Sequence, residues 1–231
     1  VIWFCWLQGM DNAPALVRAC HNSILTNLPH NRVVIITADN YREYVVLPEY
    51  IERKYHNGII PHPLFSDILR LALLIRYGGT WIDASVLCTS DKYWEVIQKS
   101  RLFLFRYFRN GKEEGVSNWF IHATPCNIVL SKILGMTLAY WQDYDCTVEY
   151  YIFHLFYSIA ARQYPEEVRH MPRGNSYANI KLGHSLHQDF SSAAWLGLTS
   201  EVSFHKLNYR NSEKADKNPN SLYHYIIRQY S

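Results

Sequence analysis

Apolar runs and helical spacings alternate along the first part of the chain. Residues 1–5 and 33–36 are short apolar runs, and the second, which is β-branched, is typical of a strand buried on both faces. Between these runs, apolar residues recur at helical spacing over 16–28. Proline 48 opens a further short helix that we expect to reach about residue 56.

The next segment carries the clearest helix boundaries. We expect Ser66 to cap a helix over 67–77, because a serine hydroxyl accepts the free N–H groups of a first turn. Gly78 and Gly79 then supply the glycine that commonly follows a helix, and a strand is expected at 80–86. The resulting order of strands and helices predicts an α/β fold with a largely parallel sheet, whose ligands bind beyond the carboxyl ends of the strands.

The second half of the chain is less regular. We expect strands at 102–105, 119–121 and 201–207, helices at 124–140 and 147–163, a loop-rich stretch at 165–200, and an irregular stretch at 211–221 before a short amphipathic tail. Neither an internal repeat nor a sharp boundary interrupts this pattern. We therefore predict one domain over residues 1–231.

Composition excludes several classes of protein. With 231 residues, 48% of them hydrophobic, the chain can bury a large core and is not intrinsically disordered. The net charge of +3 is small and the basic residues are scattered, which disfavours a nucleic-acid binder. Aromatic residues reach 15%. This surplus predicts either an aromatic core or a groove lined with rings.

The sequence also bears on location. Apolar stretches such as 71–75 are broken by Arg70 and Arg76, so we expect no membrane span, and residues 1–7 do not resemble a signal peptide. Five cysteines are dispersed without Cys-x-x-Cys pairs: Cys5, Cys20, Cys88, Cys126 and Cys146. An odd, scattered set predicts buried free thiols in a reducing compartment, which favours the cytoplasm.

Three charged residues are the first candidates for chemistry. Asp67 and Arg70 are three apart, so they share one helical face near an N-terminus whose free N–H groups suit a phosphate. Asp83 ends an internal strand, where a carboxylate is costly unless it meets a metal, a cation or hydrogen-bond donors. Spacing alone equally allows an intrahelical Asp67–Arg70 ion pair, with Asp83 capping a turn.

These motifs resemble those of a known enzyme family. The sequence Ser66-Asp67-Ile68-Leu69-Arg70, then Tyr77-Gly78-Gly79 and a strand ending in Asp83, is similar to GT-A glycosyltransferases. The nearest resemblance is to the capsular polysaccharide synthesis proteins and their relatives in glycosyltransferase family 32. Segments along the whole chain add to it: Ile2-Trp3, Gln8-Gly9, Ala13-Pro14, residues 47–50, residues 118–121 and residues 204–207.

The resemblance implies a fold and an activity. The fold would be a GT-A-type mixed, mostly parallel sheet flanked by helices, with a nucleotide-sugar-binding half over about 1–100. A helical, loop-rich acceptor half would follow over about 101–231. The enzyme would move a hexose from a UDP-sugar, such as UDP-galactose or UDP-glucose, to a glycan acceptor in capsular or cell-surface polysaccharide synthesis, with retention of configuration. A lipid-linked acceptor would bring the chain to the inner membrane face as a peripheral protein.

The resemblance also implies a donor site. Asp67 and Arg70 would hold the nucleotide-sugar, and Asp83 would begin an Asp-x-Asp motif that binds Mn²⁺ or Mg²⁺ across the donor's two phosphates. The second acidic position of this motif is Ser85, whose hydroxyl can coordinate a metal but adds no charge. His205 would complete the metal shell, and Lys206 would meet the diphosphate.

Further residues are implied around the donor and the acceptor. Glu149 is, with Asp83, the candidate catalytic residue; it would orient the acceptor hydroxyl or stabilise positive charge on the donor sugar. Gln8 and Gly9 follow the first strand and Asp39 follows the second, where this fold receives the nucleotide, although turn residues need no such role. Four aromatic rings could either stack on sugar faces, if they are exposed, or pack in the core: Trp119, Trp141, Tyr150 and Trp195.

Two alternatives stay open at this point. A metal-independent transferase would use Arg70 and Lys206 to neutralise the leaving group. A catalytically silent module that binds a nucleotide-sugar or a glycan is the other, because the second acid of the motif is missing. A Rossmann dehydrogenase is disfavoured, since no Gly-x-Gly-x-x-Gly follows an early strand.

Overall fold

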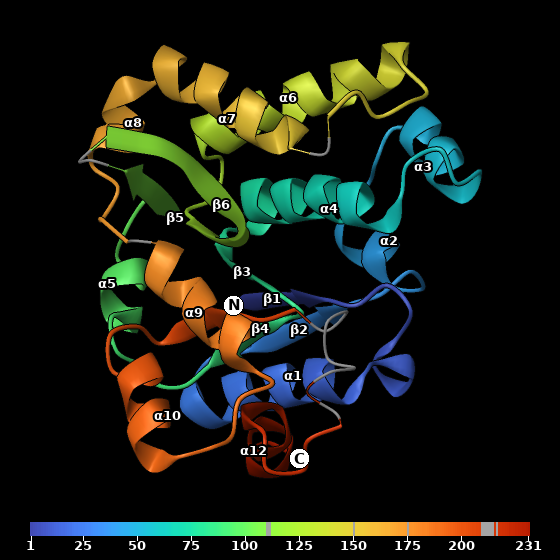
Figure 1. The fold of residues 1–231 in the computed structure, drawn as a ribbon. Helices are drawn as coiled ribbons and strands as arrows, with labels where there is room; N and C mark the ends of the chain where they lie inside the picture. The colour runs from blue at the N-terminus through green and yellow to red at the C-terminus, as the bar shows by residue number, and fades with distance from the viewer. Residues whose placement is uncertain (110–111, 150, 175, 209–214, 216) are drawn as a thin grey trace.

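A mixed five-stranded sheet forms the centre of the protein. The computed structural model describes residues 1–109, 112–149, 151–174, 176–208, 215 and 217–231 (Figure 1). The strands of the central sheet, in their order across it, are β2 (Val33–Ile36), β1 (Ile2–Cys5), β3 (Gly79–Asp83), β6 (Lys112–Ala123) and β5 (Leu102–Arg109). β1 pairs in parallel with β2 and β3, and β6 is antiparallel to both β3 and β5. Four of the five strands therefore run in one direction.

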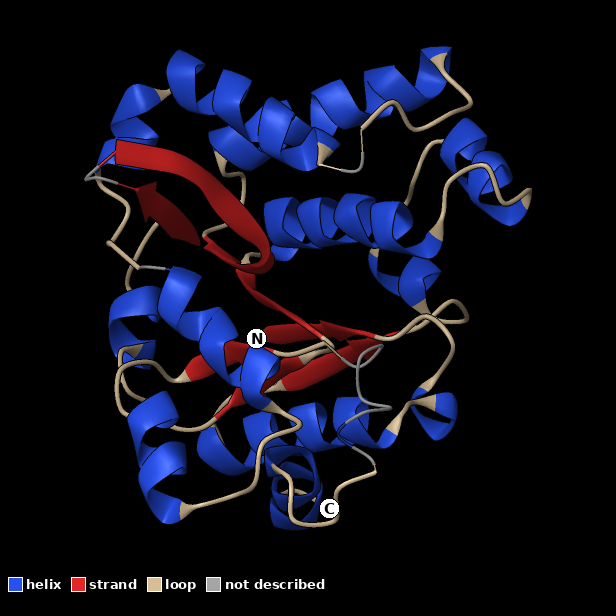
Figure 2. Ribbon diagram, viewed as in Figure 1, coloured by secondary structure: helices blue, strands red, loops and turns tan. Residues whose placement is uncertain are grey.

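Helices cover this sheet on both sides, and a second, two-stranded sheet joins β4 (Val86–Cys88) to β7 (Phe204–Lys206) (Figure 2). The helices are η1 (Met10–Asn12), α1 (Ala15–Asn27), α2 (Tyr41–Tyr44), α3 (Glu49–His56), α4 (His62–Tyr77), α5 (Trp94–Gln98), α6 (Ile128–Asp143), α7 (Ile152–Gln163), α8 (Pro165–Arg169), α9 (Ser176–Ser185), α10 (Ser192–Thr199) and α12 (Leu222–Gln229). Figure 1 places α1 and α12 on one side of the parallel strands and α4, α6 and α7 on the other.

The pattern of β1 explains this layering. All four of its residues are buried, and successive side chains point to opposite faces of a strand. Ile2 and Phe4 pack in the apolar cluster that includes residues of α1, whereas Trp3 and Cys5 pack in the cluster that includes α4 and α6. A strand with apolar residues on both faces must have helices on both sides of it. The sequence predicted two-sided burial for the run at 33–36 instead; there only Val34 and Ile36 are buried, and Val33 and Ile35 stay partly exposed in β2, the edge strand of the sheet.

The predicted mixed α/β architecture is confirmed, but several boundaries are wrong. α4 begins at His62, so Ser66 lies inside the helix and does not cap it; Pro63 stands in the first turn, where its missing N–H costs nothing. α6 begins after Asn127, whose side chain accepts the Leu130 N–H at 3.1 Å. α7 begins at Ile152 rather than at 147.

The stretch expected to be loop-rich is also different. Residues 165–200 contain α8, α9 and α10, and α10 is capped by Ser191, which accepts the Ala194 N–H. The expectation failed because these helices are short and bury few apolar residues: α8 and α10 have no buried residue, and Leu182 is the one buried apolar residue of α9. Little apolar periodicity therefore marks them in the sequence. The amphipathic tail is confirmed as α12. Much of the irregular segment before it lies outside the described residues.

Burial corrects the expectation for two of the cysteines and shows which of the candidate aromatic rings pack in the core. All five cysteines are free, but Cys126 and Cys146 are exposed rather than buried. Trp119 and Trp141 lie in the core, Trp195 packs on Tyr225, and Tyr150 falls outside the described residues. In the described part of the chain, no helix is both long enough and apolar enough to cross a membrane.

The strand pair β3–β6 contains a buried histidine whose charge state is linked to stability. His122 is opposite Thr80 in the register, and its Nδ1 lies 2.8 Å from the Thr80 hydroxyl. Burial lowers the pKa of His122 from 6.5 to about 4. The folded protein thus keeps this ring neutral in a pH range where the unfolded chain protonates it.

We expect the free energy of unfolding to fall as pH decreases from about 6.5 to about 4. In that window the unfolded state binds one more proton at His122, which costs about 1.4 kcal/mol per pH unit. Urea unfolding at several pH values measures the free energy of unfolding, and its slope against pH should be lower by this amount in the His122→Gln variant than in the wild-type protein. An unchanged slope in His122→Gln would contradict the assignment.

Candidate active site

The turn from α4 to β3 brings the charged residues of the sequence motif together. Gly78 ends α4 with φ of 67°, and a Cβ there would lie 2.7 Å from Pro125 Cδ, so only glycine fits. The chain therefore passes directly from the helix into β3. Asp83, at the carboxyl end of β3, then returns beside Asp67 and Arg70 on the buried side of α4.

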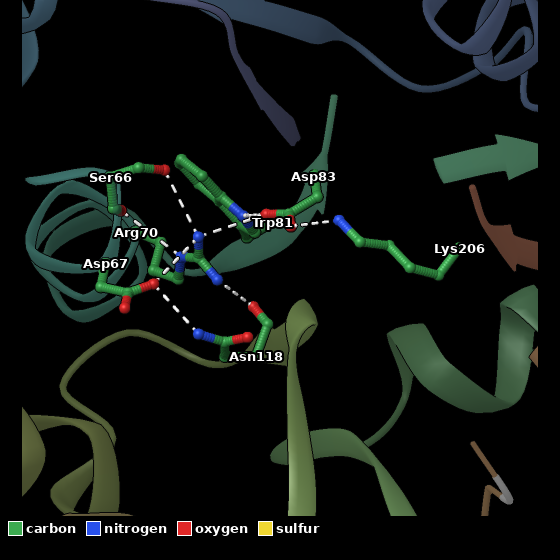
Figure 3. Close-up of polar contacts among 7 residues, drawn as sticks. All are labelled: Ser66, Asp67, Arg70, Trp81, Asp83, Asn118 and Lys206. Atoms are coloured by element: carbon green, nitrogen blue, oxygen red, sulfur yellow. Dashed lines mark hydrogen bonds and ion pairs between the residues drawn. The ribbon is translucent and has the colours of Figure 1, made fainter. Parts of the chain in front are cut away.

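Arg70 is the centre of this cluster. Its guanidinium Nη2 lies 3.0 Å from Asp67 Oδ1 and 3.2 Å from Asp83 Oδ1, and its Cζ stands 4.9 Å from the centre of the Trp81 ring (Figure 3). The residue is only 4% exposed. The intrahelical ion pair that spacing allowed is thus formed, and the same guanidinium also binds Asp83.

Arg70 donates further hydrogen bonds. It donates from Nη1 to the Asn118 carbonyl, from Nη2 to the Ser66 hydroxyl at 3.3 Å, and from Nε to the Ser66 carbonyl at 3.4 Å. The Asn118 side chain donates in turn to Asp67 Oδ1 at 3.0 Å. Arg70 therefore joins α4, β3 and β6, and its position identifies it as a residue that orders the site.

Lys206 approaches the same cluster from β7. Its Nζ lies 2.6 Å from Asp83 Oδ2, while the Trp81 indole N–H donates to Asp83 Oδ1 at 2.8 Å (Figure 3). Burial disfavours ionisation of Asp83, but the positive charges of Lys206 and Arg70 outweigh it and lower the pKa of this carboxyl. Asp83 is thus an anion held between two cations.

Asp67 has the opposite pKa shift. It is 9% exposed, and burial raises its pKa to about 6, although Arg70 favours the charged form; the nearby charge of Asp83 adds to the rise. The two carboxylates differ because Lys206 bonds Asp83 alone. A guanidinium shared between two carboxylates stabilises the charged form of each less than a cation bound to that carboxylate alone would.

These groups lie in a cleft of about 740 Å³ at the carboxyl ends of β1 and β3. This is the edge of the sheet where the sequence predicted a ligand. Of the predicted site residues, the lining includes Gln8, Asp67, Arg70, Asp83, Ser85 and Lys206. The lining also includes residues that the sequence analysis did not assign to the site, among them Asn118, Tyr151, His154, Gly183 and His184.

The structure places the other predicted residues outside this lining. Gly9 precedes η1 with φ of 80°, and Asp39 lies in the turn after β2, beside Asn40, whose side chain bonds the backbone of that turn. Glu149 is exposed before α7, and its carboxylate accepts the Tyr151 N–H at 3.1 Å. Glu149 therefore precedes the helix in which the sequence predicted it, and the next residue, Tyr150, lies outside the described residues.

His205 is not brought together with Asp83 and Ser85. It is fully buried in β7, where alternate side chains face opposite ways, so it points away from the cleft into which Lys206 projects. Its Nε2 lies 3.1 Å from the Thr89 hydroxyl, and burial lowers its pKa to about 4. Its surroundings are those of a packed core histidine.

The donor set at Asp83 does not fit the expected Mn²⁺ or Mg²⁺. Lys206 bonds Oδ2, and Trp81 and Arg70 bond Oδ1, so a divalent cation would have to displace an ammonium group. Ser85 supplies only a hydroxyl, and the described residues hold no cluster of three His, Cys, Asp or Glu side chains with metal-binding geometry. These residues therefore do not form a site for a divalent cation.

Asn118 is the main site residue without a predicted role. An amide at the start of the apolar run Trp119-Phe120-Ile121 was the available signal, because a polar residue in a buried strand needs hydrogen-bond partners. Its partners, Asp67 and Arg70, are about fifty positions away in sequence. Without the sheet pairing, that signal could not be connected to the motif.

Comparison with known protein families shows to which family this chain belongs. The family described as "Capsular polysaccharide synthesis protein" matches residues 1–226. The chain belongs to this family. A comparison with curated proteins found no match.

Two solved structures are similar to this capsular polysaccharide synthesis protein over most of their length. The PaToxG glycosyltransferase is 14% identical, with a TM-score of 0.47, and the match covers 99% of this chain and 86% of that one. The galactosyltransferase LgtC, solved with donor and acceptor sugar analogs, is 9% identical with a TM-score of 0.48, covering 100% and 96%. Similarity at this level identifies no substrate or site residue here.

We expect Arg70→Met to destabilise the protein by about 3–5 kcal/mol, because it leaves the Asp67 charge buried without its cation. Adding Asp67→Asn should recover part of the loss, since the unpaired charge is then removed. Urea unfolding measures both effects. The matched control is Arg169→Met, which breaks an exposed i,i+3 pair with Glu166 and should cost far less. Equal losses for the two arginines would contradict the central role of Arg70.

Proposed function

We propose that this capsular polysaccharide synthesis protein is a glycosyltransferase that moves a hexose from a nucleotide-sugar donor to a glycan acceptor. Two observations support the proposal. The family match covers nearly the whole chain, and a charged cleft lies at the carboxyl ends of β1 and β3, where α/β sheets receive their ligands.

The observation that carries the proposal is the charge arrangement on the cleft floor. A nucleotide-sugar has an anionic diphosphate next to a neutral sugar with many hydroxyl groups. The ammonium group of Lys206 can bind the diphosphate, and the carboxylate of Asp83 beside it can accept hydrogen bonds from the sugar hydroxyl groups. An ammonium and a carboxylate held side by side therefore suit both parts of a nucleotide-sugar.

The reaction would break the bond between the anomeric carbon and the β-phosphate oxygen, with the electron pair leaving on that oxygen. A new bond would form between the anomeric carbon and an acceptor hydroxyl, whose proton leaves with the nucleoside diphosphate or into water. The cleft residues would bind and orient the donor: Lys206 the diphosphate, Asp83 the sugar, and Gln8 the nucleotide. Arg70 and Asp67 would hold Asp83 in place.

The finer proposal rests on the family resemblance of the sequence. The donor would be a UDP-hexose, with UDP-galactose and UDP-glucose the first to test, and the product would keep the anomeric configuration. The acceptor would be a lipid-linked oligosaccharide at the inner membrane face. We keep Glu149 as the candidate residue that orients the acceptor; its side chain is exposed and does not line the donor cleft.

The proposal is tested by incubating the protein with a panel of UDP- and GDP-sugars and measuring nucleoside diphosphate release, with and without glycan acceptors. We expect release from one donor, and a loss of about 100-fold or more in kcat for Asp83→Asn, because that change removes the charge that holds Lys206. Arg169→Met, distant from the cluster, should keep the wild-type rate.

Two results would contradict the proposal. Tight donor binding without release, even with acceptors present, would identify a binding module instead. Full activity in Asp83→Asn would show that the cleft described here is not the reacting site.

A further inference from the structure

Among the lysines and arginines in the described lining of the cleft, Lys206 is the one whose charged group is exposed to a ligand. Arg70 is 4% exposed and its donors reach Ser66, Asp67, Asp83 and Asn118. The Lys206 ammonium has three hydrogens, its side chain is 27% exposed, and among the described residues its hydrogen-bond partner is Asp83. An anion entering the cleft therefore meets Lys206 rather than Arg70.

The backbone holds Lys206 in this position from three directions. It pairs with Val86 in the β4–β7 sheet, and the next residue, Leu207, donates its N–H to the Ser85 carbonyl at 2.8 Å. On the third side α9 approaches closely: a Cβ on Gly183 would lie 2.5 Å from the Lys206 carbonyl oxygen. Only glycine permits this approach, so the root of the lysine side chain is fixed before any ligand binds.

Asp83 holds the other end of the lysine. The carboxylate lies 2.6 Å from Nζ through Oδ2, and its Oδ1 is occupied by the Trp81 indole and Arg70. The acid that a divalent cation would need is thus already bound to protein cations. The serine at the second acidic position of the motif agrees with this, since Ser85 would add no charge to hold a metal.

We propose that the Lys206 ammonium, seated on Asp83, replaces the divalent cation: it binds the leaving diphosphate, and transfer needs no metal. The inference rests on the proposed function and deepens it. As the bond to the anomeric carbon breaks, its electron pair stays on the β-phosphate oxygen, and Lys206 stabilises that charge by donating N–H bonds while it keeps its proton. Lys206 supplies one positive charge where a divalent metal would supply two, and it supplies no coordination site.

The experiment is calorimetric titration of UDP, GDP and inorganic pyrophosphate into the protein, in excess EDTA and again with Mn²⁺. For the tightest ligand, we expect dissociation constants that agree within about threefold under the two conditions. Lys206→Met should weaken binding about 10- to 100-fold, the range of a hydrogen bond to a charged group. Lys206→Arg should restore most of the affinity, because a guanidinium also donates to phosphate.

Lys99→Met is the matched control, since Lys99 pairs with Glu95 on the surface away from the cleft and its loss should leave the affinity unchanged. Thermal unfolding of Lys206→Met checks that the variant folds, as Asp83 keeps Arg70 and Trp81 as partners. Once the donor is known, its turnover in EDTA should match that in Mn²⁺.

The outcomes separate this inference from the proposed function. Binding or turnover that requires Mn²⁺ would overturn the inference and leave the glycosyltransferase proposal intact, and so would wild-type affinity in folded Lys206→Met. No binding of UDP, GDP or pyrophosphate to the wild-type protein under either condition would overturn both.

Discussion

The cleft depends on a single buried guanidinium. Arg70 reaches the carboxylates of Asp67 and Asp83 and the carbonyl of Asn118, so one side chain connects α4, β3 and β6. Burying such a charge costs several kcal/mol, and the cost is offset only if its donors are met. Here the partners come from three elements, which fixes their relative positions. The rigid floor of the cleft is the consequence.

The charges on that floor are unequal, and this gives them separate uses. Asp67 shares its cation and has a raised pKa, whereas Asp83 is held by two cations and stays ionised. Lys206 is the member of the cluster that keeps both exposure and spare donors. Asp67 and Arg70 thus hold Asp83 in position from the buried side of the site, while Asp83 and Lys206 face the cleft. In a capsular polysaccharide synthesis protein, this division suits a nucleotide-sugar whose leaving group is a diphosphate.

Local signals in the sequence predicted much of this arrangement. The apolar run at 1–5 predicted the strand β1, and Gly78 marked the turn that returns Asp83 to Arg70. The strand expected at 201–207 already implies that His205 and Lys206, which are adjacent, face opposite ways. Which of the two enters the cleft could not be predicted, because it depends on the pairing of β7 with β4. Asn118 could not be assigned either, because its contact with Asp67 depends on the pairing of β6 with β3.

The central claim is that protein cations, and not a divalent metal, neutralise the ligand in this cleft. Electron paramagnetic resonance of Mn²⁺ tests it most directly, because free and bound Mn²⁺ give different signals. The titration is made with the protein, the nucleoside diphosphate that it binds, and the Asp83→Asn variant. We predict that neither the wild-type protein nor Asp83→Asn binds any Mn²⁺ in addition to the Mn²⁺ that the nucleotide binds by itself. Stoichiometric Mn²⁺ binding that is lost in Asp83→Asn would contradict the account.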